Sequence, residues 1–502
     1  MKCKNVLLSL SVLAGLSLVG CAQDVNSANV ANNGAVTKDE RPNIIVILTD
    51  DHGYADVGFN NSPDLKTPNL DQLAYGGTIF TSAYVAHPFC GPSRAALMTG
   101  RYPHEYGAQF NLPRKGSNQG LPKEETFISK VLQNAGYYTG AIGKWHLGEH
   151  ADHHPNVRGF DEFYGFLAGG HYYFPEKYEP EYERLVKRGK HNVNMYYWPL
   201  EYNGQEVREP EYLTDGLSRE ASTFVEKASK KDKPFFLYLA YNAPHTPLEA
   251  KEEDMALFPN ITDKNRKIYA GMVYAVDRGV GKLVDTLKRT GEYDNTLIVF
   301  LSDNGGKTIK GANNYPLRRG KGSAYEGGIR VPMMFHWPKE IKGGNTFHHP
   351  VSALDFYPMF AALGNAKIPE GKDLDGYNVW PKIQAGKPTH DTKMIYAMRH
   401  QKGFSETSGR LGDYKVVRTS KEGPWQLFNV QTDPGEHNDL AAQKPWLLRE
   451  MVSQIEIWSW DHQQPKWFHI WDAGGEWHEQ NMPRFHETFK VGQADPVLQA
   501  QP

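Results

Sequence analysis

Cysteines are scarce in this sequence, and so are long apolar runs and net charge. Three cysteines in 502 residues mean that stability must come from a hydrophobic core and not from disulfides. Beyond residues 6–19, no apolar run is long enough for a membrane-spanning helix. A net charge of −2 argues against nucleic acid as the main partner. No internal repeat has the spacing of a solenoid.

The N-terminus has the pattern of an export signal. Lys2 and Lys4 precede the apolar residues 6–19, so we interpret residues 1–20 as a secretory signal peptide that removes Cys3. Residues 18–21, Leu-Val-Gly-Cys, resemble a bacterial lipobox. This resemblance implies cleavage before Cys21 and lipidation of that residue. An ordinary signal peptide cut nearby is the alternative.

A lipidated Cys21 would make the protein a secreted bacterial lipoprotein, in the periplasm or at the outer membrane or cell surface. Residues 21–40, rich in Asn, Ala, Ser and Val, are predicted to be a flexible tether. Membrane contact would then depend on the lipid alone. The remaining length is ample for one large domain and a smaller one, and 39% hydrophobic and 23% charged residues are typical of a globular protein.

Short apolar runs alternate with helical patterns along the first two thirds of the chain. The predicted strands are residues 44–48, 137–142, 234–241 and 296–301. The predicted helices have apolar positions within residues 127–135, 217–228 and 272–287. Thr126 is expected to cap the first helix, and Gly136 and Gly291 to end the first and last. This alternation predicts an α/β fold, with a large, mostly parallel sheet sandwiched by helices.

Each predicted strand runs into polar residues that can do chemistry. These are Asp50 and Asp51, Lys144 with His146, His245, and Asp303 with Asn304. Each alone could serve as an ordinary turn or structural residue. Ligands bind at the carboxyl ends of parallel strands, so equivalent positions at four strand ends predict one shared site.

Cys90 opens the string CGPSRAALMTGR, residues 90–101. Pro92 suits the first turn of a helix and Gly100 suits its end, so Cys90 is expected at a helix N-terminus. Free amides and the helix dipole favour an anion there. The alternative is a small buried thiol ahead of a helix.

This string resembles the signature of the type I, formylglycine-dependent sulfatases of the alkaline phosphatase superfamily. The resemblance implies that a separate maturation enzyme oxidises Cys90 to Cα-formylglycine, whose hydrated aldehyde attacks a sulfate ester. Gly91 and Met98 are variants of the pattern. With Cys3 removed and Cys21 lipidated, the mature fold would contain no free thiol.

A second group of predicted site residues can supply only oxygen ligands: Asp50, Asp51, Asp303 and Asn304. Clustered carboxylates repel one another unless a cation neutralises them, and oxygen ligands select a hard cation. We predict Ca²⁺, with Mg²⁺ as second choice. The resemblance implies that the formylglycine made from Cys90 also contacts this ion, whereas His52 is interpreted as structural.

Three further segments resemble sulfatase elements: GKWHLG from residue 143, APHTP from residue 243, and RGKGSAYEGGIRVP from residue 319. The resemblance implies that Lys144 and Lys321 hold sulfate oxygens. His245, with Lys321, would protonate the departing alcohol, and His146 would deprotonate the formylglycine sulfate. Arg94 would position the formylglycine and the metal-binding carboxylates.

The C-terminal part resembles the smaller sheet of sulfatases at residues 412–417, 426–429 and 433–436. We therefore predict a catalytic domain at residues 41–385 and a C-terminal subdomain with an antiparallel sheet at residues 386–502. The latter includes a tail with Trp458, Trp460, Trp467, Trp471 and Trp477, which could pack on this subdomain or help to build the outer pocket.

The substrate is expected to be a sulfated oligo- or polysaccharide, such as an algal polysaccharide or a glycosaminoglycan fragment. Nine aromatic residues between 171 and 212 suit a sugar platform, although ordinary packing is an equal alternative. Proximity to the motifs makes His104, His171 and Arg318 candidate substrate contacts. The alternative functions are a phosphomonoesterase or phosphonate hydrolase of the same superfamily, and a glycan-binding surface lipoprotein without activity.

Overall fold

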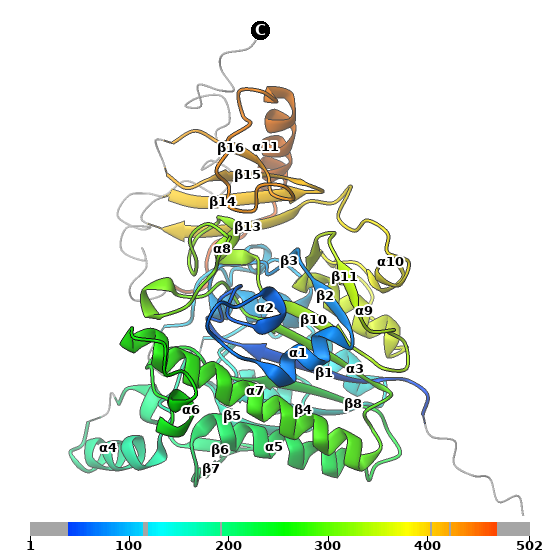
Figure 1. Cartoon of the computed structure of the whole chain (residues 1–502). Helices are drawn as coiled ribbons and strands as arrows, with labels where there is room; N and C mark the ends of the chain where they lie inside the picture. Colours follow the sequence, from blue (N-terminus) through cyan, green and yellow to red (C-terminus); the bar gives the residue numbers. More distant parts are fainter. Residues whose placement is uncertain (1–38, 114–118, 191–192, 402–403, 421–422, 469–502) are drawn as a thin grey trace, which may run out of the picture. The chain divides into compact units, whose positions relative to one another are not determined.

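A computed structural model describes residues 39–113, 119–190, 193–401, 404–420 and 423–468. The predicted signal peptide, Cys21 and nearly all of the predicted tether lie outside these residues, as do Trp471 and Trp477. In the described part, ten strands form one large sheet in the order β11-β2-β10-β9-β1-β8-β4-β5-β6-β7 (Figure 1). No described helix combines the length and apolarity needed to cross a membrane.

The centre of this sheet is parallel, as predicted. β9, β1, β8, β4 and β5 pair in parallel, whereas β10 runs antiparallel to β9 and β6 runs antiparallel to β5. The strand bounds are β1 Asn43–Thr49, β2 Thr78–Phe80, β4 Tyr138–Lys144, β5 Glu162–Phe166, β6 Leu200–Tyr202, β7 Gln205–Val207, β8 Phe235–Ala240, β9 Thr296–Ser302, β10 Met333–His336 and β11 Asn345–Phe347.

Both faces of the sheet are covered because side chains alternate along each buried strand. On β1, Ile45 and Ile47 pack in a core with α1 (Pro68–Tyr75), α5 (Leu213–Ala228) and α7 (Lys264–Thr290). The alternate residues Ile44 and Val46 pack on the other face, with α2 (Cys90–Thr99), α3 (Ile128–Asn134) and α9 (Phe356–Leu363). Each such aliphatic side chain stabilises the fold by about 1.5–3 kcal/mol.

The predicted helix ends are partly correct. Gly291 ends α7 in the left-handed conformation, with φ 74°. Thr126 does not cap α3, because the N-cap residue is Phe127 and no side chain bonds the free amides there. A tyrosine hydroxyl, that of Tyr357, instead donates to the Thr126 carbonyl at 3.1 Å. α5 and α7 begin four and eight residues before the first apolar position used to predict them.

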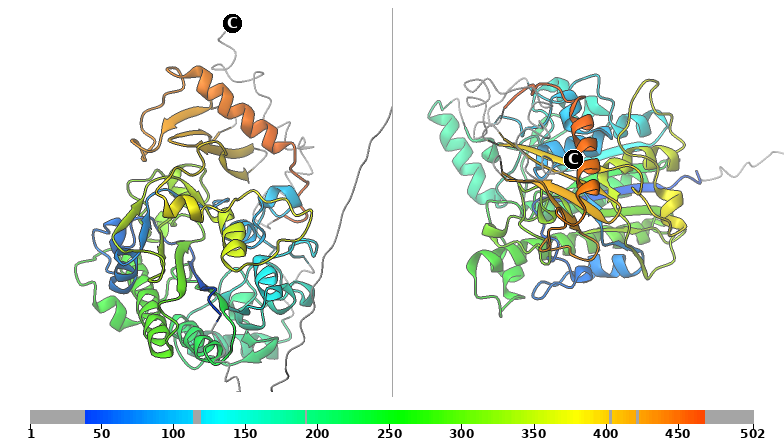
Figure 2. Two further views of the ribbon diagram at one scale, coloured as in Figure 1. Left: turned by 90° about the vertical axis from the view of Figure 1, so that its right-hand side faces the viewer. Right: turned by 90° about the horizontal axis from the view of Figure 1, so that it is seen from above.

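A second sheet of four antiparallel strands follows, which confirms the predicted C-terminal sheet (Figure 2). Its strands are β13 Ile395–Gln401, β14 Phe404–Leu411, β15 Tyr414–Arg418 and β16 Gln426–Asn429, and α11 (Pro445–Ser459) packs on β14 and β15. Trp458 is buried in this packing and Trp467 donates to the Phe110 carbonyl at 2.8 Å, whereas Trp460 is exposed.

Candidate active site

Strand register brings the predicted polar residues to one edge of the large sheet. Thr49 of β1 lies opposite Ser302 of β9, so Asp50 and Asp303 leave the sheet at the same level. Leu48 pairs with Ala240 of β8, and Ala240 pairs with Gly143 of β4. Lys144 ends β4, and His245 lies in the loop after β8. The expected convergence of four strand ends is thus observed.

Cys90 is the first residue of α2, and Gly100 ends this helix with φ 69°. The Cys90 thiol lies 3.7 Å from Asn111 Oδ1, which also accepts a hydrogen bond from the Gly91 amide at 2.9 Å. A Cβ at Gly91 would come within 2.7 Å of that oxygen, which accounts for glycine here. Burial raises the pKa of the Cys90 thiol, so it stays protonated at neutral pH.

Arg94, one turn along α2, is fully buried and joins the helix to the sheet edge. Its Nε donates to Asp303 Oδ2 at 2.9 Å, and its Nη2 lies 2.8 Å from the same oxygen in an ion pair. Its Nη1 donates to the Lys144 carbonyl at 3.1 Å. Burial and the neighbouring Asp50 raise the pKa of Asp303 to about 7. Arg94 therefore holds together three of the segments that build the site.

Two lysines pair with the first two carboxylates. Lys144 Nζ contacts Asp50 Oδ2, and Lys321 Nζ lies 2.5 Å from Asp51 Oδ1. Burial would raise the pKa of Asp50, but the combined positive charges around it, that of Lys144 foremost, hold that pKa well below its usual range. Burial would lower the pKa of Lys321, but the combined negative groups around it, Asp51 foremost, raise that pKa. Both lysines are therefore charged at neutral pH.

Two histidines face the same region in their neutral form. His245 Nε2 lies 3.8 Å from Asp51 Oδ2, and burial lowers the pKa of His245 to about 4. Burial, reinforced by Lys144, also lowers the pKa of His146 well below its usual value. His146 has a left-handed backbone with φ 63°, and a Cβ at Gly169 would come within 2.6 Å of its Nε2. The glycine thus makes room for the imidazole.

The carboxylate cluster fits a hard cation. Two overlapping groups of side chains could hold a metal ion, because one ligand atom from each member lies within 4.8 Å of the others. The first group is Asp50, Asp51 and His245, and the second is Asp50, Cys90 and Asp303. Asp50 Oδ1 and Asn304 Oδ1 are buried without a hydrogen-bond partner. Two unpaired buried oxygens are costly unless a ligand satisfies them, and oxygen donors suit Ca²⁺ or Mg²⁺.

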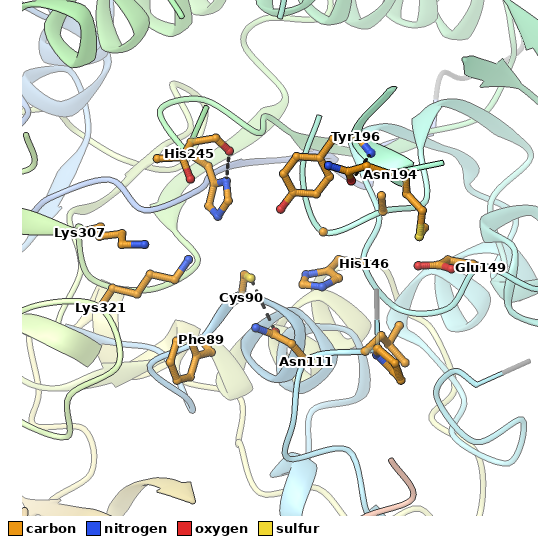
Figure 3. A pocket seen from close by; sticks show the side chains of 16 residues that line it. Phe89, Cys90, Asn111, His146, Glu149, Asn194, Tyr196, His245, Lys307 and Lys321 are labelled. Atoms are coloured by element: carbon orange, nitrogen blue, oxygen red, sulfur yellow. Dashed lines mark hydrogen bonds between the residues drawn. The ribbon is translucent and has the colours of Figure 1, made fainter. Parts of the chain in front are cut away.

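A cavity of about 310 Å³ opens in front of these residues (Figure 3). Cys90, His146, His245 and Lys321 line it, as the sequence predicted. Its wall also contains Phe89, Asn111, Glu149, Asn194 and Lys307, which were not predicted from the sequence. Tyr196 lines the wall too, and it is one of the nine aromatic residues that suggested a sugar platform.

The three residues that the sequence offered as substrate contacts, His104, His171 and Arg318, lie outside the lining of this cavity. His104 is fully buried among the rings of His87, His462 and Trp458. His171 bonds the carbonyls of Tyr172 at 2.6 Å and Trp198 at 2.8 Å through its two ring nitrogens.

Arg318 donates to the Glu436 carbonyl at 3.1 Å, and its guanidinium lies 4.1 Å from the Tyr325 ring centroid. None of the three lines the cavity. Their observed contacts are with other parts of the chain, which proximity to the motifs in sequence could not reveal. His52, between Thr49 and the Asp56 carbonyl, is structural as interpreted.

Cys90 at a helix N-terminus, near lysines and a carboxylate cluster at the edge of a parallel sheet, forms an arrangement typical of hydrolases of anionic esters. Residues 42–366 match the family described as Sulfatase, and residues 320–457 match N-sulphoglucosamine sulphohydrolase, C-terminal. The chain belongs to the sulfatase family and is a sulfuric ester hydrolase.

Relatives extend over most of the chain. Arylsulfatase J of Mus musculus is 30% identical over 461 residues, which cover 83% of this chain and 75% of the relative. N-acetylgalactosamine-6-sulfatase of Canis lupus familiaris is 32% identical over 425 residues, covering 82% and 78%. The protein in the crystal structure of Ps i-CgsB in complex with k-i-k-neocarrahexaose is 60% identical in sequence, with a TM-score of 0.88. The match covers 90% of this chain and 100% of that chain.

Proposed function

We propose that this protein removes sulfate from a sulfated oligo- or polysaccharide of the carrageenan type. The structure of Ps i-CgsB with k-i-k-neocarrahexaose supports this substrate class, because 60% identity over 90% of the chain is high. The proposal favours an algal polysaccharide over a glycosaminoglycan fragment. The observation that carries the reaction is the placement of Cys90 at the start of α2, in one cavity with Lys321, His146 and His245.

Cys90 is proposed to be converted to Cα-formylglycine by a separate maturation enzyme. The string at residues 90–101 supports this, and so does its place at a helix N-terminus, where amides and the dipole favour an anionic substrate. The hydrated aldehyde would supply the nucleophile that a protonated, buried thiol does not. Asn111, which already contacts the Cys90 side chain, would orient the modified residue.

One divalent cation is proposed to complete the site, with Ca²⁺ preferred over Mg²⁺. Asp50, Asp51, Asp303 and Asn304 would hold it, and two of their oxygens are buried and unpaired. When bound, it would supply Lewis-acid stabilisation of charge on the sulfate and on the nucleophile, the modified Cys90. Arg94 keeps Asp303 in position through one donated hydrogen bond and an ion pair.

The lysines and histidines of the site are proposed to have different roles, in sulfate binding and in proton transfer. Lys144 and Lys321 would hold sulfate oxygens, because both remain protonated. His245, with Lys321, would protonate the departing alcohol. An anionic sulfate beside the imidazole favours its charged form and so raises its pKa from the low value of the free site. His146 is neutral and unpaired at Nδ1, as suits a base that regenerates the aldehyde.

The protein is further proposed to be a secreted lipoprotein of the bacterial periplasm or outer surface, anchored through Cys21. The lysine-flanked apolar residues 6–19 and the lipobox-like residues 18–21 support this. Contact with the membrane would be limited to the lipid. Fractionation of the producing cells tests this. We expect the Cys21→Ala variant to be exported normally but to be released from the membrane.

Intact-mass analysis of the Cys90 peptide, from protein made in its native host, tests the central step. We expect a mass that shows an aldehyde in place of the thiol, together with sulfate release from sulfated carrageenan oligosaccharides. An unmodified thiol in active protein would refute the nucleophile. Faster turnover of the phosphate ester of the same sugar would instead support the phosphomonoesterase alternative.

A further inference from the structure

A second cavity of about 410 Å³ adjoins the catalytic cavity. The two share Glu149, Ala168 and Met195 as lining residues. The second cavity is called here the carboxylate groove, and its other lining residues are Phe166, Leu167, Tyr182, Trp198, Pro199, Glu201, Gly204 and Glu206. The segment after β5, together with β6 and the turn to β7, builds most of it. Its size falls within the range of ligand pockets, about 300–1,000 Å³.

Charge is distributed unequally between the two neighbouring cavities. Lys307 and Lys321 lie on one side of Cys90, and Glu149 lies on the opposite side, beyond His146 (Figure 3). The carboxylate groove begins at Glu149 and adds Glu201 and Glu206, and no cationic side chain is among the described residues that line it. A sulfate group would be attracted to the lysine side and repelled from the groove.

The groove also offers an aromatic surface and hydrogen-bond acceptors. Trp198 is 41% exposed, and its carbonyl is held by His171 Nε2 at 2.8 Å, so its backbone is fixed. Glu201 is oriented by His154 Nε2 at 2.6 Å. Glu149 Oε2 is buried without a partner, and burial raises the pKa of this carboxyl to about 7. Sugar hydroxyls donate hydrogen bonds to such oxygens, and the face of a sugar ring packs on an indole.

We infer that the carboxylate groove binds an unsulfated sugar unit next to the sulfated unit that occupies the catalytic cavity. This inference rests on the proposed function and specifies which substrates it favours. The enzyme then selects oligosaccharides in which the neighbour on the groove side has free hydroxyls. A second sulfate on that neighbour lowers the affinity, because the carboxylates of Glu201 and Glu206 face it.

Trp198→Ala tests the groove through chain-length dependence. Sulfate release is measured for a sulfated carrageenan disaccharide and hexasaccharide whose neighbouring units are unsulfated. We expect the ratio of kcat/KM for the hexasaccharide to that for the disaccharide to fall about tenfold, through KM. The matched control is Trp446→Ala, which removes a 68% exposed tryptophan on α11 and leaves both values unchanged. An unchanged ratio in Trp198→Ala overturns the inference.

Glu206→Lys tests the charge with a residue whose side chain is exposed, so that the fold is not at risk. We expect it to raise kcat/KM for a hexasaccharide with an additional sulfate on the neighbouring unit, relative to one without it, by fivefold or more. Glu370→Lys makes the same change at an exposed position that lines neither cavity. Equal preference in both variants overturns the inference. Failure of the wild type to release sulfate from any of these sugars would contradict the proposed function instead.

Discussion

Glu406 Oε1 accepts a hydrogen bond of 2.9 Å from the Ser323 hydroxyl, which ties the small antiparallel sheet to the loop that carries Lys321. The same oxygen accepts from the Ala324 amide at 3.1 Å. Arg399 of β13 donates to the Gly322 carbonyl at 2.5 Å. The C-terminal sheet therefore holds each of the three residues that follow Lys321.

Glu406→Ala is expected to lower kcat for sulfate release by tenfold or more, because the Lys321 loop loses a buried acceptor for two donors. Glu406→Gln keeps an oxygen at the same place and should restore most of kcat. Steady-state kinetics and thermal unfolding of both variants check this. Equal impairment of the two variants, or normal kcat in Glu406→Ala, would contradict a positioning role for Glu406.

Lys321→Ala should reduce sulfate release by a factor of about 100 or more, since one preorganised charge facing the transition state contributes on that scale. Cys90→Ala should abolish it. Both variants are expected to keep the wild-type circular dichroism spectrum. Lys339→Ala removes an exposed lysine and serves as the control. Wild-type rates in Lys321→Ala would refute its catalytic role.

Removal of divalent cations should lower both activity and thermal stability. A ligand at 100 times its Kd stabilises the folded state by about 2.7 kcal/mol, so chelation lowers Tm and added Ca²⁺ restores it. Asp50→Asn should weaken this response, whereas Asp373→Asn, at an exposed position, should leave it intact. A Tm that is insensitive to chelator and Ca²⁺ in the wild type would show that the carboxylates do not hold a cation.

Acidification should destabilise the protein through its buried histidines. Burial lowers the pKa of His104 to about 3, compared with about 6.5 in an unfolded chain. The unfolded state therefore binds a proton in this window that the folded state does not. Stability is greatest above pH 6.5 and falls towards pH 3, by up to about 1.4 kcal/mol per pH unit for this group.

Urea unfolding at pH 7.5, 6 and 5 measures this loss, and His104→Phe should flatten its pH dependence. His348→Phe, which replaces an exposed histidine, should not. The packing of His87 and His462 beside His104 strengthens the expectation, because burial also lowers the pKa of both rings. The same pH dependence in His104→Phe and the wild type would exclude His104 as its source.

Much of the fold and the chemical centre could be predicted from the sequence, because both depend on short-range patterns. The apolar residues of β1 and β9 specify strands buried on both faces. In a parallel sheet such strands bring Asp50 and Asp303 to one edge whatever the details of packing. The string that begins at Cys90 likewise contains its own helix start and its own helix end at Gly100.

Only the tertiary structure decided what lies around that centre. His104 and His171 are polar residues near the motifs, yet burial and carbonyl partners remove them from the cavity. Asn111 and Glu149 reach it from loops, whose course depends on long-range contacts and has no sequence period. The sequence by itself therefore determined the helix start at Cys90 and the charged residues at the strand ends, because both are local patterns. Folding decided which residues line the cavity, because that depends on long-range packing.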